Sequence, residues 1–140
     1  PITDKKMTRF NLTLLEGVNF VLKCMDLMWG GEIFVPKIPS YKIMDVAKAI
    51  APKCEHKVIG IRPGEKLHEE MITVSDALNT VEFNNYFVIT PSIQIWSKKK
   101  FATESNGSKG KPCRQTFSYN SETNPDFLSV EDLRQLIKTL

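Results

Sequence analysis

The sequence predicts an α/β fold, because segments with helical periodicity alternate with short β-prone runs along its 140 residues. Its residues are 41% hydrophobic, 25% charged and 9% aromatic, which is typical of a globular chain and argues against collagenous, disordered and coiled-coil classes. The longest apolar runs are far shorter than the roughly 20 residues that cross a bilayer, so no membrane span is expected. The formal net charge of +3 is too small to indicate a nucleic-acid-binding surface.

The chain is expected to begin with an amphipathic helix over residues 14–28. Thr13 and Glu16 have the spacing of a capping box at its start, and Gly30-Gly31 permit the left-handed turn that ends a helix. Its apolar positions recur at steps of three or four residues: Leu14, Val18, Val21, Met25 and Met28. The run Ile33–Val35 that follows predicts a buried strand.

A second helix is expected after Ser40, which can cap its N-terminus, and it should end before Pro52. Its apolar face comprises Ile43, Val46, Ala47 and Ile50. Residues 56–62 predict a second strand, and Pro63-Gly64 predicts the turn after it. Residues 65–71 contain strong helix formers and predict a short helix.

The second half is expected to hold two short strands, a loop and a helix. Residues 81–90 and 93–96 are β-branched or aromatic and predict the strands. Residues 98–126 are polar and, in their first part, basic, which predicts a long mobile loop. Ser129 and Asp132 then have the spacing of a capping box. The buried stripe of this last helix comprises Val130, Leu133, Leu136 and Ile137.

The cysteines and histidines show no pattern of a metal site or a disulfide framework. Cys24, Cys54 and Cys113 are odd in number and lie 30 and 59 residues apart, so we interpret them as reduced thiols of a cytoplasmic protein. His56 and His68 are the only imidazole side chains. A metal site is therefore not expected.

Arg62 is the leading candidate for a ligand-binding residue. It stands at the end of an expected strand and directly before the Pro63-Gly64 turn, and ligands of α/β proteins gather at the carboxyl ends of strands. A guanidinium there can hold a phosphate through two parallel hydrogen bonds. A phosphate would repel Glu65, so ribose or sugar hydroxyl groups are its expected partners. The alternative is that Arg62 and Glu65 form a surface ion pair.

Other polar residues give weaker signals. Arg9 precedes the first helix and could supply a second cation to the same ligand. Asp45 and Lys48 are interpreted as surface residues of the second helix. An imidazole can act as a general acid or base near neutral pH, but no partner is apparent for His68, and a structural role is expected. The sequence contains no P-loop, no GxGxxG turn and no nucleophile–base pair, so its residues predict anion binding and no catalytic residue.

Four segments carry a resemblance to a known family: residues 4–10, 31–37, 59–69 and 119–129. The most specific of them contains the octapeptide RPGEKLHE at Arg62–Glu69. Together they resemble the C-terminal portion of inverting UDP-N-acetylglucosamine 4,6-dehydratases. These enzymes belong to the extended short-chain dehydrogenase/reductase superfamily and act in pseudaminic acid and polysaccharide biosynthesis.

The resemblance implies that Arg62 and Arg9 bind the UDP pyrophosphate and that Glu65 lies beside the nucleotide sugar. It also implies that the catalytic residues and the residues that bind NADP belong to an N-terminal Rossmann core that these 140 residues lack, so the chain alone is expected to be inactive. The implied partners are UDP-N-acetylglucosamine, that Rossmann domain and, in the complete protein, further copies in a homo-oligomer.

The resemblance further divides the chain into four parts. Residues 1–36 would complete the nucleotide-binding domain, residues 37–97 would form the substrate-binding α/β portion, residues 98–126 the mobile loop and residues 127–140 the final helix. Without the Rossmann core, the first helix and strand are expected to leave exposed an apolar face on the order of several hundred Å² and a sheet edge.

Other functions remain open. The chain could be a stand-alone module that binds a nucleotide sugar or another anion without catalysis, or part of a related UDP-sugar epimerase. A nucleic-acid contact is conceivable at residues 98–114, where Phe101 is interleaved with basic residues, but the small net charge argues against it. We expect no nucleic-acid and no membrane partner.

Overall fold

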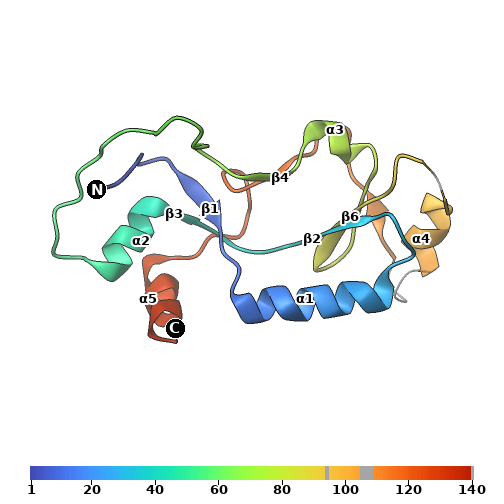
Figure 1. Ribbon diagram of the computed structural model, residues 1–140, viewed down its shortest axis with the longest axis horizontal. Helices are drawn as coiled ribbons and strands as arrows, with labels where there is room; N and C mark the ends of the chain where they lie inside the picture. The colour runs from blue at the N-terminus through green and yellow to red at the C-terminus, as the bar shows by residue number, and fades with distance from the viewer. Residues whose placement is uncertain (94, 105–108, 140) are drawn as a thin grey trace. The chain divides into compact units, whose positions relative to one another are not determined.

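The computed structural model describes all residues except 94, 105–108 and 140 (Figure 1). Its mixture of helices and strands confirms the expected α/β class. The chain forms two compact units, each assembled from segments that are distant in sequence. Unit 1 contains residues 1–11, 38–70 and 120–140, and unit 2 contains residues 12–37 and 71–119. The four-part division expected for the complete enzyme stays a prediction.

Within its described residues, unit 1 holds a pair of strands and a pair of helices in full. Strands β1 (Thr8–Phe10) and β3 (Ser40–Lys42) pair antiparallel. Helix α2 (Ile43–Ile50) follows β3 directly and packs against α5 (Val130–Lys138). The expected capping box of α5 is confirmed, since the side chains of its first turn exchange hydrogen bonds with the backbone as predicted.

The predicted cap of α2 is wrong. Ser40 is fully buried in β3, where its hydroxyl accepts a hydrogen bond from Asn124 Nδ2 at 2.9 Å. Its backbone also pairs with residues 126 and 128. The N-cap of α2 is Lys42, whose side chain makes no capping hydrogen bond. The serine therefore fixes the segment before α5, a long-range role that local spacing does not reveal.

Two predicted elements of unit 1 are wrong. Residues 56–62 form no strand apart from an isolated bridge between Ile2 and Val58. Residues 65–71 form no helix: Leu67 O accepts a hydrogen bond from Thr8 N–H, and long-range pairing of this kind overrides helix propensity. Strand β4 (Glu70–Ile72) follows.

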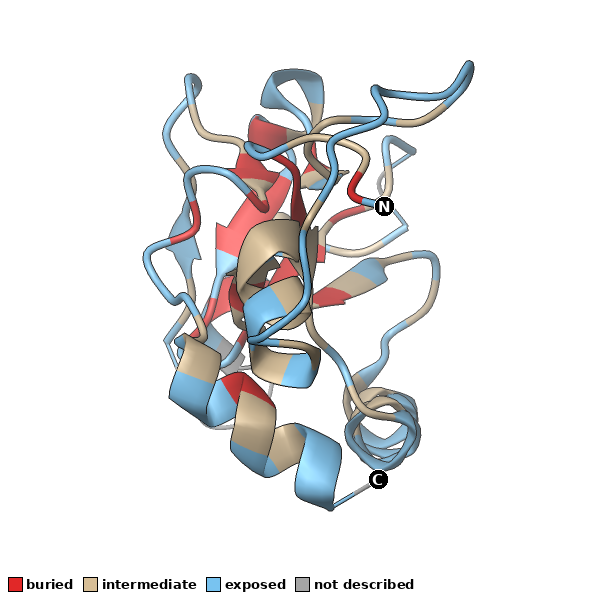
Figure 2. Ribbon diagram, turned by 90° about the vertical axis from the view of Figure 1, so that its left-hand side faces the viewer, coloured by how far each residue is buried: buried red, intermediate tan, exposed pale blue. Residues whose placement is uncertain are grey.

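Unit 2 contains an antiparallel sheet in the order β2-β6-β5-β7. Its strands are β2 (Ile33–Pro36), β6 (Tyr86–Ile89), β5 (Thr80–Glu82) and β7 (Lys111–Pro112). The strand predicted over residues 81–90 is thus a hairpin of β5 and β6. Figure 2 shows that buried residues are concentrated on strands, whereas the helices are mostly intermediate or exposed.

The helices of unit 2 are α1 (Leu14–Leu27), α3 (Val74–Ala77) and α4 (Lys98–Glu104). Helix α1 and its capping box are confirmed. Its Phe20 and Leu27 pack against a core cluster of Val81, Phe83, Tyr86, Val88, Phe101 and Ala102.

The segments expected to be a strand and a loop differ from prediction. Ile93, Ile95 and Trp96 lie in bends, and Gln94 lies outside the described residues. Residues 98–126 include α4, β7 and β8 (Tyr119–Asn120), and the fully buried Phe101 anchors α4 to the core. Polar composition did not reveal this single aromatic anchor. The expected mobility of residues 98–126 stays a prediction, and residues 105–108 lie outside the described part of the chain.

Candidate functional site

The octapeptide Arg62–Glu69 lies in unit 1 and begins with a well-defined turn. Gly64 has a φ of +85°, which lies in the left-handed region that glycine adopts without strain. Glu65 Oε2 accepts a hydrogen bond from Arg62 N–H at 2.9 Å, and Glu65 N–H donates to Arg62 O at 3.1 Å. The carboxylate therefore closes the turn on which both candidate residues stand.

The Arg62 side chain is exposed to solvent at this turn. Among the described residues its guanidinium has no hydrogen-bond or ion-pair partner. Arg62 and Glu65 therefore do not form the surface ion pair that the sequence left open as an alternative. A guanidinium carries five N–H donors in a fixed planar arrangement. All of them remain available to an anion that approaches the turn.

Arg9 is bound differently, although the sequence suggested the same role for both arginines. It lies on β1, and its side chain is 22% exposed. Its guanidinium donates to backbone oxygens of Thr8 at 2.7 Å, Lys66 at 2.8 Å and Leu67 at 3.2 Å, and its Nε lies 3.3 Å from Glu69 Oε1. Arg9 thus connects β1 to the octapeptide, and its direct contact with a ligand stays a prediction.

A second connection between β1 and the octapeptide was missed in the sequence. His68 Nδ1 lies 2.8 Å from the hydroxyl of Thr8, which lies 2.7 Å from the hydroxyl of Ser121. Thr8 and Ser121 are buried. The only local signal for this connection was a threonine within a short β-prone run. Its partner Ser121 lies 113 residues away and gives no signal in the local sequence.

Asp45 and Lys48 form the exposed (i, i+3) ion pair expected of surface residues, with 3.4 Å between Lys48 Nζ and Asp45 Oδ1. Across the described residues, no group of three or more His, Cys, Asp or Glu side chains could hold a metal ion. Each helix in that part of the chain is too short or too polar to cross a bilayer.

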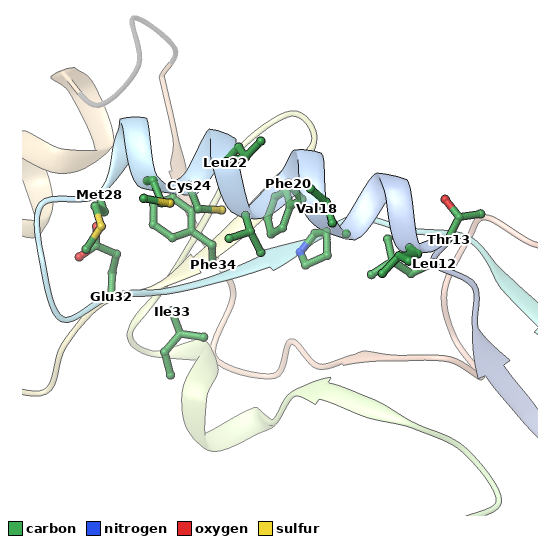
Figure 3. A pocket seen from close by; sticks show the side chains of 15 residues that line it. Leu12, Thr13, Val18, Phe20, Leu22, Cys24, Met28, Glu32, Ile33 and Phe34 are labelled. Carbon is green, nitrogen blue, oxygen red and sulfur yellow. The ribbon is translucent and has the colours of Figure 1, made fainter.

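Unit 2 carries an apolar groove between α1 and β2, with a volume of ≈ 880 Å³ (Figure 3). Leu14 is 87% exposed and Met25 is 63% exposed on α1, and Ile33 is 60% exposed on β2. In the described part of the sheet, β2 is an edge strand. The expected exposed apolar residues and the edge position of β2 are therefore present in the described residues, and the expected area of the face stays a prediction.

One polar atom in this α1/β2 groove lacks a partner. Glu32 lines the groove, and its Oε1 accepts a hydrogen bond from Trp29 N–H at 2.5 Å. Its Oε2 is buried without a hydrogen-bond partner among the described residues. Buried carboxylate oxygens are normally paired, so Glu32 Oε2 is an exception within the described part of the chain.

Comparison with known proteins shows several similar sequences and folds. Residues 1–91 match the family described as "Polysaccharide biosynthesis protein". The chain is 51% identical over 138 residues to a UDP-N-acetylglucosamine 4,6-dehydratase (inverting) of Campylobacter jejuni, which covers 98% of this chain and 41% of that protein. It is 30% identical over 143 residues to a UDP-glucose 4-epimerase of Rickettsia canadensis, which covers 99% of this chain and 40% of the epimerase.

The fold is similar to a solved structure described as "X-ray structure of Pen from Bacillus thuringiensis". The TM-score is 0.77 and the sequence identity 26%, over 99% of this chain and 40% of that one. The chain thus spans about two fifths of the length of these relatives.

Proposed function

Because the chain belongs to the polysaccharide biosynthesis protein family, we propose that it is the UDP-sugar-binding part of a UDP-N-acetylglucosamine 4,6-dehydratase that inverts C5. The unpartnered guanidinium of Arg62 on its fixed turn is the observation that carries this proposal. Identity of 51% with the Campylobacter jejuni dehydratase, against 30% with the Rickettsia canadensis epimerase, favours the dehydratase over the epimerase.

In this proposal, the residues of the octapeptide bind the substrate and take no part in bond breaking. Arg62 donates two parallel hydrogen bonds to the pyrophosphate. Glu65 uses Oε2 to close the turn, and its Oε1 accepts from a hydroxyl of the ribose or sugar. Arg9 supports the loop, and it reaches a phosphate oxygen only by exchanging one of the backbone carbonyls that it now binds.

NADP does not fit the residues described here. A dinucleotide site needs a strand that leads through a glycine-rich turn into the N-terminus of a helix. Strand β3 leads directly into α2 without a glycine, and β2 ends at a proline. We therefore assign NADP, the catalytic residues and the chemistry to the part of the complete enzyme that this chain does not span, and we expect the chain alone to be inactive.

We further propose that this other part of the enzyme covers the α1/β2 groove. Helix α1 is apolar both on the side that packs on the core and on its exposed side, which is typical of a helix buried in a complete protein. Homo-oligomerisation, a cytoplasmic location and a place in pseudaminic acid biosynthesis belong to the same proposal.

Calorimetric titration with UDP-N-acetylglucosamine tests the binding role. We expect weak binding to the chain and a loss of about 10- to 150-fold in Arg62→Ala, because a charged hydrogen-bonding group contributes about 1.5 to 3 kcal/mol. Arg62→Lys should retain part of the affinity, since a lysine keeps the charge but loses the paired geometry.

Arg134→Ala is the matched control, because Arg134 lies on α5 and pairs with Glu131 at 3.3 Å. It should bind like the unmodified chain. Unchanged affinity in Arg62→Ala, or an equal loss in Arg134→Ala, would contradict the proposal.

A further inference from the structure

A buried hydrogen-bond chain connects the end of the octapeptide to β1 and to the turn after β8. Glu69 N–H donates to Ser121 Oγ at 2.9 Å, Ser121 Oγ lies 2.7 Å from Thr8 Oγ1, and Thr8 Oγ1 lies 2.8 Å from His68 Nδ1. Thr8 is 3% exposed and Ser121 is fully buried. All of these residues belong to unit 1.

The direction of this chain follows from the need to place every buried proton. Ser121 Oγ already accepts from Glu69 N–H, so the hydroxyl proton of Ser121 is satisfied when it is donated to Thr8. Thr8 then donates its own proton to His68 Nδ1. His68 Nδ1 is therefore an acceptor, and the imidazole carries its proton on Nε2.

The other side of the imidazole supports the same tautomer. His68 Nε2 lies 3.6 Å from Glu122 Oε1. Glu122 is held in a turn in which Asn120 Oδ1 accepts from the backbone N–H groups of Glu122 at 3.0 Å and Thr123 at 2.9 Å. A proton on Nε2 faces the carboxylate favourably. The opposite tautomer would turn a lone pair toward this carboxylate. It would also leave one of the two hydroxyl protons of Thr8 and Ser121 without an acceptor within this set of groups.

We propose that His68, as the Nε2–H tautomer, is a positioning residue that fixes the octapeptide for the diphosphate of the UDP sugar. This inference rests on the proposed function. Arg62 and Glu65 stand on a turn that lies six to three residues before His68. The Thr8–His68 hydrogen bond and the Arg9 guanidinium hold the segment after this turn against β1. A fixed segment loses less conformational freedom when the ligand binds. The hydrogen bonds among Ser121, Thr8 and His68 therefore raise the affinity for the ligand without contacting it.

The tautomer can be measured without any ligand. In ¹⁵N NMR spectra recorded at pH 8, the imidazole of His68 should be protonated on Nε2 alone. Thr8→Ser keeps the hydroxyl and should keep this signature, whereas Thr8→Val has nearly the same shape without the hydroxyl and should give a mixture of tautomers. A proton on Nδ1 in the unmodified chain would overturn the inference.

Titration with UDP-N-acetylglucosamine then tests the positioning role. We expect Thr8→Val to bind about tenfold more weakly than the unmodified chain and Thr8→Ser to bind with unchanged affinity. If Thr8→Val does not fold, Ser121→Ala serves in its place, because it removes the acceptor of Glu69 N–H. Equal affinity of Thr8→Val and the unmodified chain would overturn the positioning role alone. An unmodified chain that has the Nε2–H tautomer but binds no UDP-N-acetylglucosamine would overturn the proposed function instead.

Discussion

Two arginines of unit 1 show that the surroundings of a side chain decide what it can do. Arg9 and Arg62 have the same charge and donors, and the sequence suggested that both bind one anion. Arg9 uses its donors on backbone oxygens and on Glu69, whereas Arg62 faces solvent. The first therefore stabilises the loop and the second remains available to a ligand. Sequence spacing could not separate these roles, because all acceptors of Arg9 except the neighbouring Thr8 O lie 57 to 60 residues away.

The thiol of Cys113 should be unreactive. Partial burial in unit 2 is the main cause that raises its pKa from 9.0 to about 11, and Glu82 adds to the shift, while Lys37 and Lys98 oppose it. A rise of two units lowers the thiolate fraction at pH 8 about a hundredfold, and the thiolate is the reactive form.

Timed alkylation at pH 8 with peptide mass spectrometry checks this expectation. Cys54 is exposed and should be labelled first, and Cys113 should be labelled last. In denaturant all three cysteines should react at similar rates, which serves as the control. Labelling of Cys113 as fast as Cys54 in the folded chain would contradict the burial that we describe.

At the scale of the element, α1 stands out because many of its apolar side chains are exposed to solvent. Exposed apolar residues recur at alternating steps of four and three residues along α1 and at its C-cap: Leu14, Val18, Val21, Met25 and Met28. This spacing is typical of a helix face that packs against another surface along its whole length. Leu15 and Leu22 widen the face and are themselves 69% and 57% exposed.

We expect the isolated chain to bind an apolar fluorescent dye and to sediment as species larger than a monomer, because contiguous exposed apolar surface promotes association. Replacing Leu15 and Leu22 by lysine should lower both signals. Ile50→Lys is the matched control, since Ile50 is 65% exposed on α2 in the other unit and should change neither signal. A monomeric chain that binds no dye would contradict the exposed face.

The elements that the sequence predicts correctly are those whose signals are local. The capping boxes at Thr13 and Ser129 locate α1 and α5, because both partners of each box lie within one turn. The failures depend on distant partners. Ser40 lies in β3 and accepts a hydrogen bond from Asn124, which is 84 residues away. Leu67 O accepts from Thr8 N–H, and its segment forms no helical turn.

At the scale of the whole molecule, the candidate site combines three segments that are far apart in the chain. Strand β1, the octapeptide Arg62–Glu69 and the turn at Ser121–Glu122 meet in unit 1 through the contacts of Arg9 and His68. Their place at the Pro63-Gly64 turn and the resemblance of the octapeptide predicted Arg62 and Glu65 as candidates. Neither composition nor periodicity could predict the segments that hold them. The positions of these segments depend on hydrogen bonds between residues that lie 52 to 113 positions apart in the sequence.

Chemical-shift mapping of the ¹⁵N-labelled chain tests the central claim most directly. UDP-N-acetylglucosamine and UDP should shift the amide signals of residues 62–69, whereas N-acetylglucosamine alone should leave them unchanged, because the diphosphate is the group that Arg62 binds. The contradicting result would be a set of shifts confined to other parts of the chain, or equal shifts with the free sugar.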